Sequence, residues 1–279
     1  MKVVLFCGGL GTRLRDYSDS IPKPLVNIGC RPVLWHLMKY YSSYGHNDFI
    51  LCLGYKGELI KQYFLNYDEC LSNDFIMMKG GKKIKLEKSD IHDWNITFVD
   101  TGKNNTIGQR LLLVKELLNN EDVFMANYSD GLTDLDLNQH IKTFYNHKPT
   151  ASFMSVRSNQ SFHNIISDSN NTVRSIKAIT ESDIWINAGY FIFSNKIFNY
   201  IDEGDELVDK PFQRLMQIGK LKTYKHNGFW KPMDTFKDKM EYDELEANGI
   251  SPWTIEEETN RSQHIIAYKA PRNEIIYNN

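Results

Sequence analysis

The chain has 279 residues, of which 41% are apolar and 24% are charged, the balance of an ordinary globular protein. Its formal net charge of −2 provides no basic surface for nucleic acid, and no apolar run approaches the roughly 20 residues of a membrane helix. The four cysteines lack CxxC spacing, which argues against a disulfide framework or a zinc site. These features predict a cytoplasmic protein that binds neither nucleic acid nor membranes.

The first half of the chain alternates continuous apolar runs with amphipathic stretches. Strands are predicted at residues 2–6, 49–53, 96–99 and 123–126. Short apolar runs of this kind are typical of strands that are buried on both faces of a parallel sheet. Helices are predicted at residues 33–41, from 57 onwards, at 107–118 and at 137–144. The alternation predicts a doubly wound α/β sheet whose ligand site lies at the carboxyl ends of its strands.

Beyond residue 150 the pattern changes to shorter β segments. These fall at residues 151–156, 165–166, 173–176 and 186–193, and helices are predicted at 212–218 and 235–247. We therefore expect a smaller antiparallel region at about 151–254, within one domain that spans residues 1–254. Residues 255–279 are polar and lack periodicity, which predicts an appendage or tail. The lysine- and glycine-rich insert at 72–89 is expected to form a surface loop or a hairpin.

A glycine-rich loop follows the first predicted strand. It reads Gly8-Gly9-Leu10-Gly11-Thr12-Arg13-Leu14. The loop lacks the third glycine of a Rossmann fingerprint, and no Gly-Lys-Ser/Thr follows it as in a Walker A motif. Glycines allow backbone N–H groups to approach phosphate oxygens, while Thr12 and Arg13 add a hydroxyl and a guanidinium donor. The residues alone leave two interpretations open, a phosphate cradle and a tight strand-to-helix turn.

Lys23 lies between Pro22 and Pro24. Both prolines restrict the backbone, so that the ammonium group of the lysine is expected to be aimed at one place. An anionic triphosphate is the expected target, because phosphoryl transfer depends on positioning and on charge neutralisation. A surface lysine in a rigid loop is the alternative.

Two aspartates occupy predicted junctions at the ends of strands. Asp130 follows the fourth predicted strand in Tyr128-Ser129-Asp130-Gly131, and Asp234 lies in Gly228-Phe229-Trp230-Lys231-Pro232-Met233-Asp234-Thr235. Two carboxylates that converge there would suit Mg²⁺, which uses one or two carboxylates together with waters and substrate phosphates. Taken alone, Asp234 could instead cap the helix that begins near Thr235. No histidine pair has the spacing of zinc ligands, and no nucleophile-elbow motif is present.

The order and spacing of these three motifs resemble those of sugar-phosphate nucleotidyltransferases. The chain is most similar to the CTP-using branch, the glucose-1-phosphate cytidylyltransferases, and the further matching segments are Leu34-Trp35-His36, Gly54-Tyr55-Lys56-Gly57, Trp94-Asn95-Ile96-Thr97, Val99-Asp100-Thr101-Gly102 and Pro252-Trp253. The resemblance covers roughly residues 1–254. It implies the Rossmann-like, GT-A-like α/β fold of this family, a doubly wound mixed sheet with a nucleotide-binding part at about 1–150 and a smaller antiparallel acceptor-binding region at about 151–254.

The resemblance also implies an activity. An oxygen of an acceptor phosphate would attack the α-phosphorus of CTP in line, with Mg²⁺ as cofactor, to release pyrophosphate and give a CDP-sugar for surface polysaccharide. In the family pattern the nucleotide is held by Gly8, Gly9, Thr12, Arg13, Lys23, Thr101, Gly108 and Arg110, of which the last three read the base. The catalytic residues implied are Arg13, Lys23, Asp130 and Asp234, with the two aspartates as Mg²⁺ ligands. Relatives commonly assemble, so a homo-oligomer is expected.

The acceptor side departs from the family pattern. The position of the family's phosphate-gripping lysine holds Ile179, and a glycine position beside the sugar holds His163. Lys177 lies two residues before Ile179, on the same side of an extended strand, and could replace the missing lysine. Asn187 and Gly189 match the family's Asn-x-Gly strand beside the sugar, so the expected acceptor-binding residues are Lys177, Asn187 and Gly189. The alternative is a cytidylyltransferase with a different phosphate or phosphonate acceptor.

Two interpretations from other functional classes have less support in the sequence. A non-catalytic nucleotide-binding relative would be expected to lose Arg13, Lys23 or one of the two aspartates, and all are present. A dinucleotide-dependent oxidoreductase is disfavoured because the third glycine of its fingerprint is missing.

Overall fold

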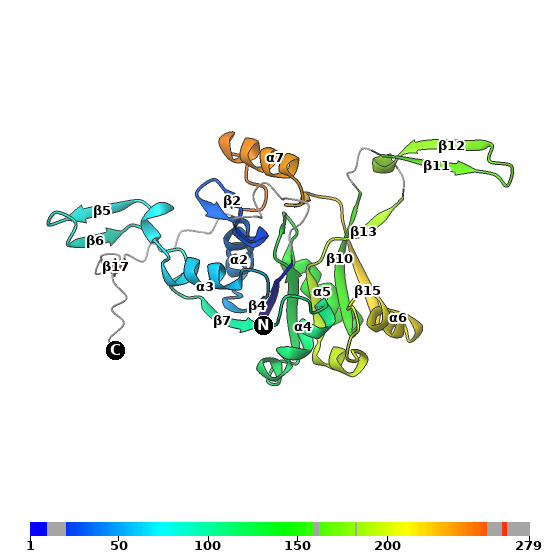
Figure 1. The fold of residues 1–279 in the computed structure, drawn as a ribbon, viewed down its shortest axis with the longest axis horizontal. Helices are drawn as coiled ribbons and strands as arrows, with labels where there is room; N and C mark the ends of the chain where they lie inside the picture. Colours follow the sequence, from blue (N-terminus) through cyan, green and yellow to red (C-terminus); the bar gives the residue numbers. More distant parts are fainter. Residues whose placement is uncertain (10–20, 159–161, 182, 256–263, 267–279) are drawn as a thin grey trace.

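The structure is a computed structural model that describes residues 1–9, 21–158, 162–181, 183–255 and 264–266. Its centre is a sheet in the order β13-β10-β14-β8-β1-β4-β7, with β15 added alongside β10 (Figure 1). The strands are β1 (Val3–Cys7), β4 (Asp48–Leu53), β7 (Asn95–Asp100), β8 (Val123–Tyr128), β10 (Ala151–Arg157), β13 (Trp185–Asn187), β14 (Phe191–Ser194) and β15 (Leu221–His226).

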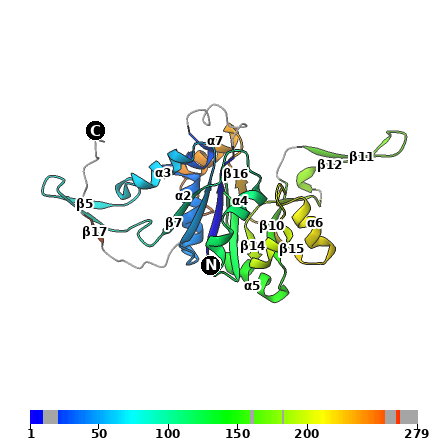
Figure 2. The ribbon, with the colours of Figure 1, turned by 60° about the horizontal axis from the view of Figure 1, so that its bottom comes forward.

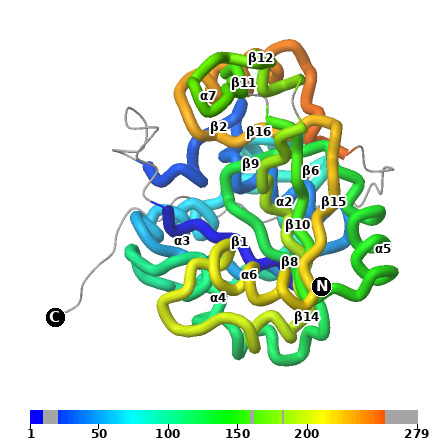
Figure 3. Tube along the Cα trace, turned by 90° about the vertical axis from the view of Figure 1, so that its right-hand side faces the viewer, coloured from blue at the N-terminus to red at the C-terminus, as the bar shows by residue number. Residues whose placement is uncertain are grey.

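The sheet is mixed. Strands β8, β1, β4 and β7 run parallel, whereas β14 pairs antiparallel with both β8 and β10. On the far side of β10 lie the antiparallel β13 and the parallel β15, the latter seen along β10 in Figure 3. The parallel strands β1, β4, β7 and β8 come from the first part of the chain and the antiparallel β13 and β14 from the second, as the sequence predicts, while β15 departs from this prediction by pairing parallel with β10.

Helices cover both faces of this sheet. One face packs against α2 (Val33–Ser43), α3 (Gly57–Leu65), α5 (Leu137–His147) and α7 (Phe236–Ala247), and the other against α4 (Ile107–Leu113) and α6 (Lys210–Gln217). Successive residues of β1 alternate between the two cores, because side chains of a strand point to opposite faces: Val3 and Leu5 enter the first core, Val4 and Phe6 the second. The prediction of a doubly wound α/β fold is confirmed.

Short pairs of strands surround the sheet. They are β2 (Asn27–Ile28) with β3 (Arg31–Pro32), β9 (Gly131–Thr133) with β16 (Trp230–Pro232), β5 (Phe75–Met78) with β6 (Lys83–Leu86), and β11 (His163–Ser167) with β12 (Val173–Ala178). The insert predicted as a loop or a hairpin is therefore a hairpin, β5–β6. Strand β17 (His264–Ile266), from the expected C-terminal tail, adds to β6. The β5–β6 and β11–β12 hairpins lie at opposite ends of the molecule (Figures 1 and 2).

Two expectations about element boundaries were wrong. The β segment expected at 186–193 is interrupted, because Gly189 and Tyr190 have φ values of +78° and +50° and turn the chain between β13 and β14. The helix expected at 107–118 ends as α4 at Leu113 and continues as a 3-10 helix, Lys115–Leu118. Further 3-10 turns are Lys23–Leu25, Glu69–Leu71, Ile179–Glu181 and Asn195–Tyr200. Each helix in the described part of the chain is too short or too polar to cross a membrane.

Candidate active site

The two aspartates singled out in the sequence are brought together by a small antiparallel ladder. Strand β9 follows Asp130 directly, and β16 ends two residues before Asp234. In the ladder Pro232 lies opposite Gly131, and the N–H of Met233 donates to the carbonyl of Asp130 at 2.7 Å. The ladder therefore fixes two carboxylates beside each other that lie more than 100 positions apart in the sequence.

Lys23 lies between these carboxylates. Its Nζ is 2.6 Å from Oδ2 of Asp130 and 2.5 Å from Oδ1 of Asp234. The side chain of the lysine is 13% exposed, so the ion pairs are largely shielded from water. Burial alone would lower the pKa of Lys23, but the two carboxylates outweigh burial and raise it. The raised pKa favours the charged form of Lys23, and the two carboxylates hold its ammonium group at one point.

The alternative that Asp234 caps helix α7 is wrong. The N-cap of α7 is Thr235, whose hydroxyl accepts from the N–H of Asp238 at 3.2 Å. In return, the carboxylate of Asp238 accepts from the N–H of Thr235 at 2.8 Å, which completes a capping box. The side chain of Asp234 turns instead towards Lys23.

A pocket of about 450 Å³ opens at the carboxyl ends of β1 and β8, beside this cluster. Its lining includes Gly8, Gly9, Lys23, Arg110, Tyr128 and Asp130. The structure therefore brings the first two glycines of the loop and the cationic lysine to one cavity, at the edge of the sheet where α/β folds bind ligands. Gly11, Thr12 and Arg13 lie outside the described residues, so their expected roles stay predictions.

Arg110 lines the pocket but has no N–H group left for a ligand. Its side chain is 3% exposed. Nε donates to the carbonyl of Asn105, Nη1 to the carbonyl of Leu53 and the hydroxyl of Thr101, and Nη2 to the carbonyls of Gly8 and Lys103. An arginine side chain has five N–H donors, and five protein acceptors take them here. Arg110 therefore ties the ends of β1 and β4 to the 101–106 loop.

The other two residues expected to read the base lie behind the pocket wall. Thr101 is 1% exposed, and its hydroxyl donates to the carbonyl of Leu53. Gly108 packs against the backbone of Asp205, where a Cβ atom would lie 2.4 Å from the carbonyl oxygen. Neither residue lines the cavity, and a direct contact of either with a base stays a prediction.

The expected acceptor residues are partly brought together. The side-chain amide of Asn187 lies 3.4 Å from the hydroxyl of Tyr128, which lines the pocket, and its oxygen accepts from the N–H of Gly189 at 2.9 Å. A larger residue would be strained at Gly189, because its φ is +78° and a Cβ atom there would lie 2.4 Å from Oδ1 of Asn127. Lys177 is exposed on β12, opposite Asn164, in the hairpin that projects from the sheet (Figure 1).

The sequence was then compared with known protein families. Residues 2–244 match the family described as nucleotidyl transferase. The chain belongs to this family. A probable glucose-1-phosphate cytidylyltransferase of Bacillus subtilis is 35% identical over 257 residues, covering 91% of this chain and 100% of the relative. The glucose-1-phosphate cytidylyltransferase of Salmonella typhi is 36% identical over 255 residues, with 91% and 98% covered. The expectation of a nucleotidyltransferase enzyme is confirmed.

Solved structures support the fold of this nucleotidyl transferase. A UDP-glucose pyrophosphorylase complexed with UDP-glucose aligns with a TM-score of 0.65 at 14% identity, covering 89% of this chain and 98% of the other. A putative glucose-1-phosphate thymidylyltransferase from Bacillus anthracis aligns with a TM-score of 0.62 at 18% identity, covering 88% and 94%. These likenesses confirm the GT-A-like, Rossmann-like architecture.

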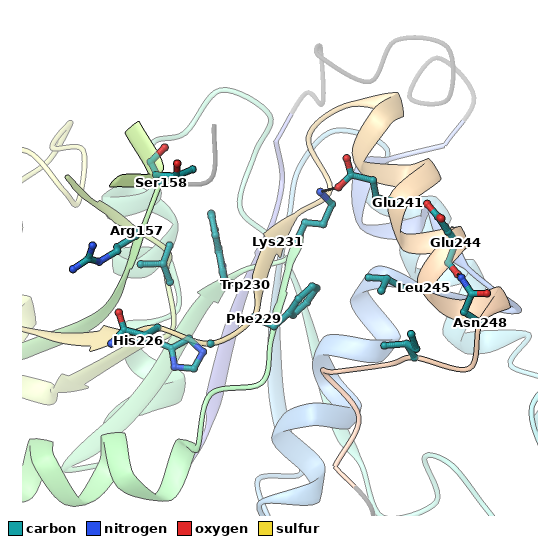
Figure 4. A pocket seen from close by; sticks show the side chains of 15 residues that line it. Arg157, Ser158, His226, Phe229, Trp230, Lys231, Glu241, Glu244, Leu245 and Asn248 are labelled. Atoms are coloured by element: carbon teal, nitrogen blue, oxygen red, sulfur yellow. Dashed lines mark hydrogen bonds and ion pairs between the residues drawn. The ribbon is translucent and has the colours of Figure 1, made fainter. Parts of the chain in front are cut away.

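The nucleotidyl transferase has a second pocket, which the sequence did not indicate. It measures about 740 Å³ and lies between the end of β10 and α7 (Figure 4). The two pockets adjoin different hydrophobic cores. Val156, which lines the second pocket, belongs to the core on the face covered by α2, α3, α5 and α7. Tyr128, which lines the first pocket, packs against the core on the face covered by α4 and α6. At the edge of the second pocket Lys231 forms an ion pair with Glu241 (Figure 4). A Thr-x-x-Asp pattern at Thr235, which is typical of a helix cap, is the signal that could have placed the start of α7 beside this ion pair.

Proposed function

We propose that the chain is a magnesium-dependent cytidylyltransferase that joins CTP to a sugar 1-phosphate and releases pyrophosphate. The observation that carries this proposal is the ammonium group of Lys23, held between Asp130 and Asp234 at the wall of a pocket that also contains Gly8 and Gly9. The cytidylyltransferase names of the two relatives support CTP as the nucleotide and glucose 1-phosphate as the acceptor.

The residues of the pocket suit transfer without a covalent enzyme intermediate. A phosphate oxygen of the acceptor would attack the α-phosphorus of CTP, and the bond from that phosphorus to the bridging oxygen of pyrophosphate would break. Gly9 leaves room for phosphate oxygens near the backbone, whereas the space beside Gly8 is filled by the guanidinium group of Arg110. Lys23 would neutralise the negative charge that develops on the leaving pyrophosphate. Its raised pKa keeps it protonated throughout the neutral range.

Asp130 and Asp234 fit a Mg²⁺ site by their donor set. Each presents a carboxylate oxygen within 2.6 Å of the same point, the Nζ atom of Lys23, so the two oxygens converge as ligands of one cation would. Among the described residues no group of three or more acidic, histidine or cysteine side chains gathers as a metal cage. Two carboxylates are sufficient for Mg²⁺, because waters and substrate phosphates complete its octahedron. Bound there, Mg²⁺ would neutralise phosphate charge and orient the α-phosphate.

A related activity with a different acceptor is the second candidate. It is favoured by Ile179 at the family's lysine position and by the exposed location of Lys177 on the projecting hairpin. A phosphate or phosphonate whose anionic group is held by other cations would suit this arrangement, while the nucleotide side would stay the same.

Pyrophosphate release from CTP with Mg²⁺ and glucose 1-phosphate, beside a control without acceptor, tests both candidates. Release that needs the acceptor supports the glucose 1-phosphate activity. Background release with glucose 1-phosphate, together with release in a panel of other sugar phosphates and phosphonates, supports the second candidate. Background release throughout the panel, with CTP binding verified by calorimetry, would overturn the proposed function.

A further inference from the structure

Asp238 connects the first turn of α7 to the backbone of Asp234. Its Oδ2 accepts from the N–H of Asp234 at 3.2 Å, from the N–H of Thr235 at 2.8 Å and from the hydroxyl of Thr235 at 2.8 Å. An ordinary capping box needs only the exchange between Thr235 and Asp238. The additional bond reaches one residue further back and fixes the peptide that carries the Asp234 side chain.

Lys231 holds Asp238 from the other side. Its Nζ lies 3.2 Å from Oδ1 of Asp238 and also contacts Glu241, one turn further along α7 (Figure 4). Lys231 is 8% exposed, and its carbonyl accepts from the hydroxyl of the buried Tyr242. Both oxygens of Asp238 are thus occupied, and the pKa of its carboxyl is lowered: burial acts to raise it, but bonds from Thr235 and Lys231 outweigh burial.

This network compensates the charge that Asp238 would otherwise place near the proposed metal ligands. Without Lys231, the carboxylate of Asp238 would be an unpaired negative charge against the backbone of Asp234. With Lys231 and Glu241 in place, Asp238 can fix the backbone of Asp234 while its own charge is paired. Residues that orient metal ligands in this way typically change metal affinity or activity by about 10- to 100-fold when they are altered.

We propose that Asp238 is a positioning residue, which, held by Lys231, presents the carboxylate of Asp234 to Mg²⁺. This inference rests on the proposed function, because it assigns Asp234 to the metal site. A helix cap that only stabilises α7 is the structural alternative. It makes a different prediction, since loss of a cap lowers stability but leaves the affinity for a metal ion unchanged in the folded protein.

The experiment is calorimetric CTP binding to the intact protein over a range of Mg²⁺ concentrations, with thermal unfolding recorded for each variant. Asp238→Asn keeps one oxygen for the cap but loses the charge that pairs with Lys231. Asp243→Asn is the matched control, because Asp243 pairs with Lys239 on the same helix, away from the capping box of Thr235 and Asp238. We expect Asp238→Asn to raise the half-saturating Mg²⁺ concentration about tenfold or more, with CTP binding in the absence of Mg²⁺ unchanged. Asp243→Asn should leave both values at those of the wild type.

Lys231→Met provides an independent test if Asp238→Asn does not fold. It should shift the Mg²⁺ requirement in the same direction, and the double variant should be non-additive. A folded Asp238→Asn or Lys231→Met variant whose half-saturating Mg²⁺ stays within about twofold of the wild type would overturn the inference, even if its unfolding temperature falls. CTP binding by the wild type that does not depend on Mg²⁺ at all would instead overturn the proposed function, and the inference with it.

Discussion

The ammonium group of Lys23 lies 2.6 Å from the carboxylate of Asp130, although 107 positions separate the two residues in the sequence. Asp234 meets the same ammonium group at 2.5 Å, so the lysine bridges both candidate metal ligands. A divalent cation coordinated by these two oxygens would compete with Lys23 for them. The phosphates of a nucleotide would offer the displaced lysine a new anionic partner, which links metal binding to nucleotide binding at this point.

Replacement of Lys23 by methionine tests this competition. The variant removes the ammonium group that contacts both Asp130 and Asp234, so Mg²⁺ alone should raise its thermal unfolding midpoint more than it raises that of the wild type. Turnover should fall by roughly 10²- to 10³-fold, because a charge that stabilises the leaving pyrophosphate is lost. An equal Mg²⁺ effect on both proteins, measured by differential scanning calorimetry, would show that lysine and metal do not share the site.

Gly8 and Gly9 make a matched pair of substitutions. A Cβ atom on Gly8 would lie 2.0 Å from Nη1 of the buried Arg110, whereas a Cβ on Gly9 would meet no atom of the described residues within 4 Å. We expect Gly8→Ala to lower the free energy of unfolding by about 1–3 kcal/mol, as in overpacked cores, and to disturb the Arg110 contacts. Gly9→Ala should unfold like the wild type in urea and yet bind CTP more weakly. Wild-type CTP affinity in Gly9→Ala would argue against a phosphate cradle.

His140 predicts how stability depends on pH. The ring is fully buried, its Nε2 lies 2.9 Å from the hydroxyl of Ser152, and burial lowers its pKa from 6.5 to about 4. The unfolded chain therefore takes up this proton first, and the free energy of unfolding should fall as the pH drops from about 6.5 to about 4. At about 1.4 kcal/mol per pKa unit the loss is about 3 kcal/mol. In urea unfolding, the free energy of unfolding of His140→Gln should therefore fall less between pH 6.5 and pH 4 than that of the wild type. The same fall in both proteins would contradict this prediction.

The elements of the core could be predicted from the sequence because their local pattern agrees with their tertiary setting. The continuous apolar residues of β1 and β4 are buried on both faces, and the amphipathic stripe of α2 packs on the sheet. Strand β15 escaped prediction because it is an edge strand with mostly polar, half-exposed residues. Strand β16 is only three residues long and contains Pro232, which argues against a strand on sequence grounds.

The candidate site was predictable as a set of residues but not as an arrangement. The motifs indicated Lys23, Asp130 and Asp234, while their meeting depends on the β9–β16 ladder, a pairing between distant segments that no local pattern specifies. Likewise, the sequence did not indicate that the five donors of Arg110 contact four backbone carbonyls and the hydroxyl of Thr101. These hydrogen bonds depend on the positions of loop carbonyl groups in the folded protein, and neither periodicity nor motif spacing indicates those positions.

The most direct test of the account is the rate of pyrophosphate release from CTP by Asp234→Asn and Asp130→Asn, at saturating Mg²⁺ and with the acceptor that the wild type uses. Asp243→Asn, on the exposed face of α7, serves as the control for unrelated loss of a carboxylate. The account predicts folded variants of Asp130 and Asp234 whose turnover falls by roughly 10²-fold or more, beside a control with wild-type turnover. Near-wild-type release by Asp234→Asn would contradict the assignment of the two carboxylates to the reaction centre.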